Sequence, residues 1–222
     1  MKTRLYIRSP LKIKLDNLLT VIQKILKKDF FSRHSSIVAP ELIGCLIVRL
    51  HEGNQVQKGI IVETEAYSQE EEACHGFNKR TKTNQTLFGE PGLFYVYKSY
   101  GIHYCLNLVT DKNNFASGVL IRSVFINRKQ ERVASGPGLL TKKFDIDTKL
   151  NSLKNYDNNY LKIFNRHINI SNNDLIQTTR IGISKAIDLK WRWYLKKSRS
   201  VSKRVKGDKI LKLKNRTTNC NL

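Results

Sequence analysis

The sequence lacks any hydrophobic run long enough to cross a bilayer. Its apolar N-terminal stretch, residues 15–26, is interrupted by Asp16, Asn17, Gln23 and Lys24, and it is too short to form the core of a signal peptide. We therefore expect a soluble protein of the cytoplasm, associated with the nucleoid if the source is bacterial. We expect no contact with a membrane.

Cysteine is scarce, with four residues scattered along a chain of 222, namely Cys45, Cys74, Cys105 and Cys220. A chain of this length can bury a core without disulfide or metal staples, and a reduced thiol in an apolar run behaves as a small hydrophobic group. His75 and His103 lie beside Cys74 and Cys105 and could complete a set of four metal ligands. Because this spacing matches no familiar zinc pattern, we expect no metal and no cofactor.

Acidic residues are few: 18 Asp and Glu stand against 40 Lys and Arg, a formal net charge of +22. This excess is far larger than solubility requires and predicts a polyanionic partner. Charge by itself does not distinguish DNA, RNA and an anionic membrane, because each rewards neutralisation of phosphate charge. Basic residues accumulate over residues 196–216, which predicts either an arm making weak, sequence-blind DNA contacts or a solvated basic end.

Periodicity predicts one early helix and several strands. Apolar residues at helical spacing over residues 15–26 predict an amphipathic helix. Strand-like runs predict a hairpin of residues 42–50 and 59–67 around Glu52-Gly53-Asn54, two strands within 93–109 and a strand over 118–126. The polar composition of residues 145–160 predicts a surface loop or poorly ordered insertion. Together they predict a single α+β domain over residues 1–222, with a mainly antiparallel sheet and surrounding helices.

The densest chemical signal is Glu63-Thr64-Glu65-Ala66-Tyr67. In a strand, the period of two places Glu63, Glu65 and Tyr67 on one face. For an arbitrary Glu-x-Glu, a solvent-facing edge strand is the better interpretation.

A second cluster, residues 92–107, favours a functional site instead. Tyr95 and Tyr97 share a strand face there, and Tyr100 falls at the turn before Gly101. Cross-strand aromatic packing explains Tyr95 and Tyr104 but poorly explains a tyrosine on a tip.

These residues resemble the alkyladenine (3-methyladenine) DNA glycosylase family. The resemblance runs from about Asp29 to Lys203, with basic extensions on either side, and several separated motifs occur in the correct order. The motifs are Asp29-Phe30-Phe31, residues 39–44, Glu63 to Tyr67, Ala73-Cys74-His75, Tyr95-Val96-Tyr97 on to Asn107, Val119-Leu120-Ile121-Arg122, Gly136-Pro137-Gly138, Arg180-Ile181-Gly182-Ile183 and Trp191-Arg192-Trp193-Tyr194.

The resemblance implies that Glu65 is the general base that deprotonates the attacking water, that Arg122 helps to position it, and that Glu63 is only a neighbour. It also implies a curled sheet with a protruding hairpin that probes DNA. On that hairpin, Tyr100 would fill the space left by an extruded nucleotide.

Four residues would form the pocket for the extruded base. The resemblance implies that Tyr67 and Tyr97 stack on it, that His75 adds polar contacts, and that Asn107 excludes guanine by crowding its exocyclic amino group. Electron-rich rings favour a cationic alkylated purine, so this pocket would prefer damaged bases.

The predicted activity is a monofunctional base-excision-repair glycosylase that hydrolyses the N-glycosidic bond of alkylated or deaminated purines in double-stranded DNA. We expect a monomer that uses no lysine nucleophile. The alternative is a basic RNA-binding or ribosome-associated protein without enzymatic activity, for which the charge and exposed tyrosines are equally natural. A nuclease is a weaker alternative, because it would normally show a carboxylate set suited to Mg²⁺.

One segment departs from the family pattern. Ser123-Val124-Phe125-Ile126 stands where the family usually has a Glu-Pro pair after the arginine, and the stretch before Gly136 is shortened. We expect the helix that follows this strand to be trimmed or displaced.

Overall fold

The computed structural model describes residues 24–208. The helix predicted over residues 15–26 therefore lies almost wholly outside the described residues. Its last part, residues 24–26, is not helical, because Ile25 forms an isolated β-bridge with Phe164.

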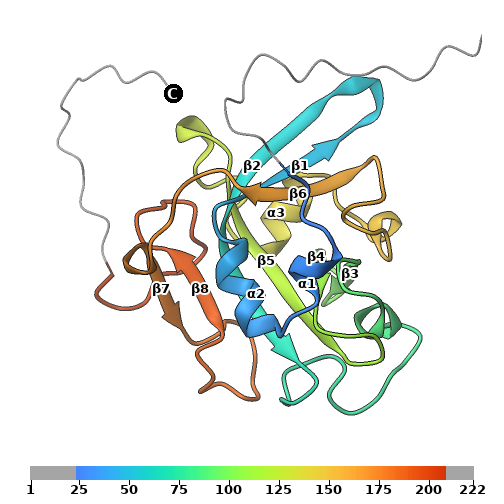
Figure 1. Cartoon of the computed structure of the whole chain (residues 1–222). Helices are drawn as coiled ribbons and strands as arrows, with labels where there is room; N and C mark the ends of the chain where they lie inside the picture. Colours follow the sequence, from blue (N-terminus) through green and yellow to red (C-terminus); the bar gives the residue numbers. More distant parts are fainter. Residues whose placement is uncertain (1–23, 209–222) are drawn as a thin grey trace, which may run out of the picture.

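The body of the protein is an eight-stranded antiparallel sheet that does not close on itself (Figure 1). Its strands are β1 (Cys45–Leu50), β2 (Val56–Ser68), β3 (Phe94–Ser99), β4 (His103–Val109), β5 (Ser117–Phe125), β6 (Leu161–Arg166), β7 (Leu175–Thr178) and β8 (Arg192–Leu195). The main path runs β3-β4-β5-β2-β1-β6, and β7 joins through β8, which pairs with β2. The predicted hairpins β1–β2 and β3–β4 and the predicted strand β5 are confirmed.

Strand β2 is central rather than an edge. One side pairs with β5 from Ile60 to Ser68, while the other pairs first with β1 and then, from Glu63 to Glu65, with β8. The interpretation of this strand as a solvent-facing edge is therefore wrong, because both of its hydrogen-bonding sides are used where the two glutamates lie.

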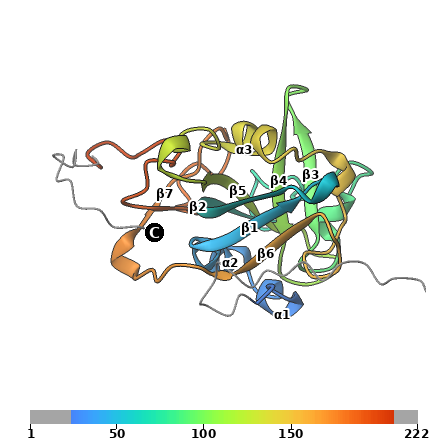
Figure 2. The ribbon, with the colours of Figure 1, turned by 90° about the horizontal axis from the view of Figure 1, so that it is seen from above.

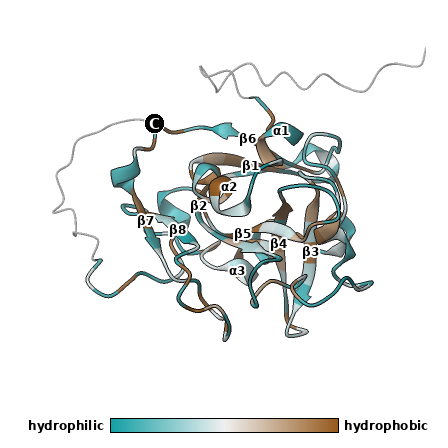
Figure 3. Cartoon of the chain, turned by 60° about the horizontal axis from the view of Figure 1, so that its bottom comes forward, coloured by the Kyte–Doolittle hydropathy of each residue, from teal (hydrophilic) through white to brown (hydrophobic). Residues whose placement is uncertain are grey.

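Helices cover both faces of the sheet, with α2 (Ser35–Leu42) on one side and α3 (Pro137–Lys143) on the other (Figure 2). The third helix, α1, is Lys28–Phe31, and single-turn 3₁₀ helices occupy Glu52–Asn54, Gln85–Phe88, Arg128–Gln130, Thr148–Leu150 and Asn172–Asp174. Hydrophobic residues concentrate in α2 and the central sheet, and hydrophilic ones in the outer loops (Figure 3). A smaller buried cluster, separate from the main core, contains Cys74, Leu87, Phe88, Tyr95, Val109 and Ala116.

The segment of residues 145–160 is irregular, as predicted, but it is not a loose surface insertion. Ile146 and Leu150 are buried in the main core. The fully buried Asn155 donates to the carbonyls of Leu26 and Ile163 and accepts from the Ile163 N–H. Because polar residues here satisfy backbone groups, the polar composition misled the sequence-based expectation.

The basic C-terminal segment also belongs to the folded body as far as residue 208. Ser200 and Val201 are buried, and Arg204 pairs with Asp208. Residues 196–208 are therefore neither an extended arm nor a loose end. Their contact with DNA stays a prediction, and the remainder of the predicted arm lies outside the described residues.

Within residues 24–208 the α+β class and the single domain are confirmed, and the predicted hairpin, β3–β4, projects beyond the rest of the described protein in Figure 2. The domain bounds of 1–222 stay a prediction. In the part of the chain from residue 24 to 208, no helix has the length and apolar character needed to span a membrane.

Candidate active site

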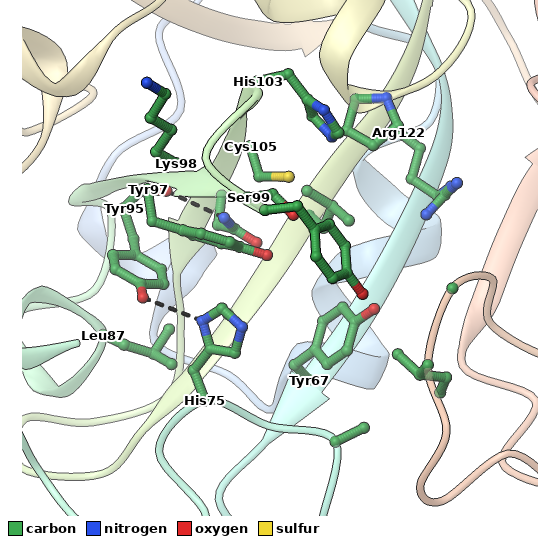
Figure 4. A pocket seen from close by; sticks show the side chains of 18 of the residues that line it. Tyr67, His75, Leu87, Tyr95, Tyr97, Lys98, Ser99, His103, Cys105 and Arg122 are labelled. Carbon is green, nitrogen blue, oxygen red and sulfur yellow. Dashed lines mark hydrogen bonds between the residues drawn. The ribbon is translucent and has the colours of Figure 1, made fainter. Parts of the chain in front are cut away.

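A pocket of about 590 Å³ opens beside the β3–β4 hairpin (Figure 4). Its wall combines rings with a few polar groups, and it is lined by Tyr67, Ala73, His75, Leu87, Tyr95, Tyr97, Lys98, Ser99, Tyr100, His103, Cys105, Asn107, Gly118, Leu120, Arg122, Pro137, Ile181, Gly182 and Ile183. Six of the seven residues predicted for the site therefore line this pocket. The seventh, Glu65, lies directly behind the pocket wall and is bonded to residues that form it.

Three rings form the aromatic side of the pocket. Tyr97 stacks on Tyr95 with centroids 5.2 Å apart, and His75 meets Tyr97 edge-on at 4.4 Å. The Nδ1 atom of His75 lies 3.1 Å from the Tyr95 hydroxyl, in a hydrogen bond (Figure 4). Because Tyr95 belongs to the smaller buried cluster, these rings rest on a rigid base.

Burial shifts the ionisation of these rings. It lowers the pKa of His75, so the imidazole is neutral at pH 7. It also raises the pKa of Tyr97, with the neighbouring Cys105 thiol adding to the effect. The aromatic side of the pocket is therefore uncharged near neutral pH.

Glu65 is fully buried and accepts three hydrogen bonds. The Tyr67 hydroxyl lies 2.9 Å and Arg122 Nη1 3.0 Å from Oε2, and the Ile181 backbone N–H lies 2.8 Å from Oε1. Tyr67, Arg122 and Ile181 all line the pocket, so the carboxylate is held at its edge by the groups that form its wall. Thr64 points the other way and donates to the Ala39 carbonyl on α2, which confirms the predicted alternation along β2.

Two register shifts bring Arg122 to the glutamates. The β2–β5 pairing skips Val62 on β2 and Arg122 on β5, so neither has a residue paired opposite. Bulges of this kind redirect a side chain. Arg122, which is 7% exposed, reaches both Glu65 and Glu63, with Nε 3.4 Å from Oε1 of Glu63. Its pKa is raised because the two carboxylates outweigh the opposing effect of burial.

Glu63 is saturated by protein atoms. Oε1 accepts from Arg192 Nε and Ser202 Oγ, both at 2.8 Å, and Oε2 accepts from Ser123 Oγ and the Ser202 N–H, both at 2.7 Å. Burial alone would raise the pKa of Glu63. The guanidinium groups of Arg122 and Arg192 and the serine hydrogen bonds outweigh it, so the pKa is lowered.

The altered segment after Arg122 takes part in this network. Ser123 bonds Glu63 and accepts from the Gly136 N–H at 3.0 Å, just before α3. The helix α3 has seven residues and packs closely on β4: a Cβ atom at Gly138 would meet Cγ of the His103 ring at 2.8 Å, so a larger residue there would have to displace that ring.

Sequence reasoning missed the anchor of the Ile181 loop. Arg180 and Glu71 form a buried bidentate pair, at 2.7 and 2.8 Å, across 109 positions of sequence. The Arg180 guanidinium also lies 4.7 Å from the centre of the Tyr67 ring. Arg180-Ile181-Gly182-Ile183 was visible as a motif, but nothing in it indicated Glu71 as the partner.

Asn107 and Tyr100 take contrasting positions. Asn107 is 6% exposed on β4, and its Nδ2 donates to the Tyr95 carbonyl at 3.1 Å, which fixes the amide against β3. Tyr100 is 85% exposed at the hairpin tip with φ +50°, and Ile102 beside it is 81% exposed. A rigid pocket wall thus lies below an apolar, solvent-exposed tip.

The thiols and histidines do not assemble into a metal-like set. Among residues 24–208, no group of three or more His, Cys, Asp and Glu side chains has the proximity to hold a metal ion. Cys74 is buried in the smaller cluster, where burial raises its pKa to about 11, whereas Cys105 and His103 line the pocket.

Comparison with known proteins gives a consistent result. The family model described as "Methylpurine-DNA glycosylase (MPG)" matches residues 29–199. A protein of Trichodesmium erythraeum is 38% identical over 197 residues, covering 81% of this chain and 98% of its own, and one of Carboxydothermus hydrogenoformans is 40% identical over 192 residues, covering 81% and 100%. A relative from Ehrlichia ruminantium is 41% identical over 174 residues, covering 77% and 89%.

All three relatives carry the name "Putative 3-methyladenine DNA glycosylase". The resemblance inferred from the motifs is therefore confirmed over most of the chain. The chain belongs to the methylpurine-DNA glycosylase family.

Proposed function

We propose that the protein is a monofunctional DNA-repair glycosylase that extrudes alkylated or deaminated purines from duplex DNA and hydrolyses their bond to the sugar. The observation that carries this proposal is the buried Glu65–Arg122 pair at the edge of an aromatic pocket. An RNA-binding or ribosomal protein has no need for such a pair, so we do not retain that alternative.

Glu65 is the general base. A water molecule at the pocket edge gives a proton to its carboxylate, the water oxygen bonds to the C1′ carbon of the sugar, and the glycosidic electrons leave with the base. Arg122 orients the carboxylate, and the Ile181 N–H fixes its second oxygen. Positioned base catalysis of this kind contributes roughly 10²–10⁴-fold.

The hairpin tip provides the extrusion step. A purine must leave the stack before its glycosidic bond is accessible, at a cost of a few kcal/mol that is smallest for damaged pairs. Tyr100, exposed on a projecting turn, is placed to occupy the vacated space and slow the return of the base.

The rings select the damaged base. Alkylation of a ring nitrogen makes a purine cationic, and an aromatic face attracts such a cation by roughly 0.5–2 kcal/mol. A neutral His75 does not repel it, and the fixed amide of Asn107 cannot move away from the amino group of guanine. We propose that alkylated purines are therefore bound in preference to normal ones.

A base-release assay tests the function. Four duplexes, each with a single 3-methyladenine, 7-methylguanine, hypoxanthine or ethenoadenine, are incubated with the protein and a metal chelator, and the free base is measured by chromatography. We expect release from at least one lesion and none from the undamaged duplex. Failure to release any of the four bases would contradict the proposal.

The monofunctional mechanism has its own test. Lys98 is the single lysine among the pocket-lining residues within the described chain, and in Figure 4 its side chain extends away from the rings. We expect no covalent adduct with DNA on borohydride treatment, no strand cleavage, and normal base release by Lys98→Ala. Adduct formation that is lost in Lys98→Ala would instead indicate a lysine nucleophile.

A further inference from the structure

A second pocket of about 350 Å³ lies beside the first. We call it the basic notch, and it is lined by Thr178, Thr179, Arg180, Ile181, Gly182, Arg192, Lys203, Arg204, Val205 and Lys206. Ile181 and Gly182 line both pockets. The segment that carries them, orange in Figure 4, borders the base pocket on the side away from His75 and Tyr97. The two pockets therefore share one thin wall.

The basic notch has an excess of positive charge. Five of its ten lining residues are Lys or Arg, and none is acidic. Three of these cations are neutralised, because Arg180, Arg192 and Arg204 pair with carboxylates outside the notch. The exposed Lys203 and Lys206 have no carboxylate partner within residues 24–208. Two uncompensated cations in one concavity favour an anionic ligand.

The paired arginines hold the lysine-bearing backbone in place. Arg192, whose Nε binds Glu63, also donates through Nη2 to the Lys203 carbonyl. Arg204 donates to the carbonyls of Lys196 and Ser198 and pairs with Asp208. The segment is therefore fixed before any ligand arrives, which lowers the entropy cost of binding.

The opposite wall is open to a ligand. Gly182 has φ +76°, and a Cβ atom added there would meet nothing within 4 Å, so its backbone borders free space. Thr178 and Thr179 add hydroxyl groups, which can donate to a phosphate oxygen.

We propose that the basic notch binds one backbone phosphate of the lesion strand, next to the extruded nucleotide. This inference rests on the proposed function, because a nucleotide whose base lies in the first pocket carries phosphates on both sides of its sugar. Because Ile181 and Gly182 line both pockets, we assign the notch to a phosphodiester of that nucleotide and not to free phosphate.

The first test is the salt dependence of duplex binding. The double variant Lys203→Ala/Lys206→Ala is compared with Lys58→Ala/Lys149→Ala, which removes two exposed lysines that line neither pocket. Loss of one phosphate contact should reduce the slope of log affinity against log salt by about 0.9 in the notch variant, with no change in the control pair. Equal slopes in the two variants would overturn the proposal.

The second test locates the phosphate. Single phosphates around the lesion are replaced by neutral methylphosphonates, and affinities are measured for the parent and the notch variant. At one position flanking the lesion, the parent should lose about ten-fold, as for a charge-assisted contact, and the variant should lose nothing further. A flat scan, or equal losses in both proteins, overturns the proposal. If the scan is flat and inorganic phosphate at constant ionic strength also displaces the duplex, the notch is a site for free phosphate instead.

Base release by the parent separates the two proposals. If the parent releases base but the scans of parent and variant coincide, only the phosphate site fails. If the parent releases no base from any lesion, the proposed function fails whatever the binding slopes show.

Discussion

Glu63 and Glu65 are two residues apart on one strand, both are fully buried, and both pair with Arg122. Their surroundings nevertheless differ. Besides Arg122, Glu63 binds Arg192, Ser123 and Ser202, which belong to the sheet and the C-terminal segment. Within residues 24–208, the partners of Glu65 are Tyr67, Arg122 and Ile181, and all three line the base pocket.

Two carboxylates on one strand face can therefore have different roles. A carboxylate enclosed by protein donors stabilises the fold, because removing it leaves buried cations unpaired. A carboxylate whose partners form a pocket wall is placed to act on what enters the pocket. We therefore expect substitutions at the two positions to fail in different ways.

Substitution of Glu65 should change activity more than any other substitution considered below. Glu65→Gln removes the proton acceptor but keeps the shape of the side chain, so base release from a neutral lesion should fall about 10²–10⁴-fold. Duplex binding should be retained. Single-turnover release and fluorescence anisotropy measure the two quantities, and a variant that keeps more than about a tenth of the parent rate would remove Glu65 from the mechanism.

The next effect is on stability at Glu63. Glu63→Ala leaves the buried Arg192 without its carboxylate partner, while Arg122 keeps only Glu65, and this should lower the free energy of unfolding by about 3–5 kcal/mol in urea titrations. Glu90→Ala is the matched control. Glu90 also pairs with two cations, Lys28 and Lys154 at 2.8 Å, but near the surface, so its loss should cost about 1 kcal/mol or less. Similar losses at the two sites would contradict the distinction.

A smaller effect concerns substrate choice on the Glu65 side. Tyr97→Leu removes the ring face, so release of cationic 7-methylguanine should fall relative to neutral hypoxanthine by about 2- to 30-fold, equivalent to roughly 0.5–2 kcal/mol. Tyr97→Phe keeps the ring and should keep the ratio. If Tyr97→Leu slows both substrates equally, the ring contributes shape and not cation recognition.

Much of this contrast could be predicted from sequence, since the alternation along β2 placed Glu63, Glu65 and Tyr67 together, and the turn at Tyr100-Gly101 placed the tip. The register shift at Arg122 could not be predicted from sequence, because it arises from how two distant strands pair. The long-range partners of Glu63 could not be predicted either, since periodicity describes only local geometry.

Polarity was a poor guide to burial for the same reason. The sequence around Asn155 is rich in Asn, Asp and Lys, and such composition is typical of solvent-exposed loops. Asn155 is nevertheless fully buried, since its amide satisfies three backbone groups of neighbouring segments. Only the three-dimensional structure shows which polar side chains are buried because they form hydrogen bonds with backbone N–H and C=O groups that no other backbone group satisfies.

The smallest effect is on the acid dependence of stability. The pKa of Glu63 is lowered in the folded state from its ordinary value of 4.5, so its stabilisation is complete above that pH and is lost as the pH falls through the folded-state pKa. Glu63→Gln should therefore flatten the fall in unfolding free energy below about pH 4.5. Glu90, whose pKa is lowered to about 2 by hydrogen bonds from Lys154 and Lys28, should make a similar contribution only at low salt, because exposed pairs are screened.

Urea titrations at several pH values in low and high salt distinguish the contributions of Glu63 and Glu90 to the unfolding free energy. A Glu63 contribution that disappears at high salt would mean that this carboxylate is open to solvent ions and not enclosed.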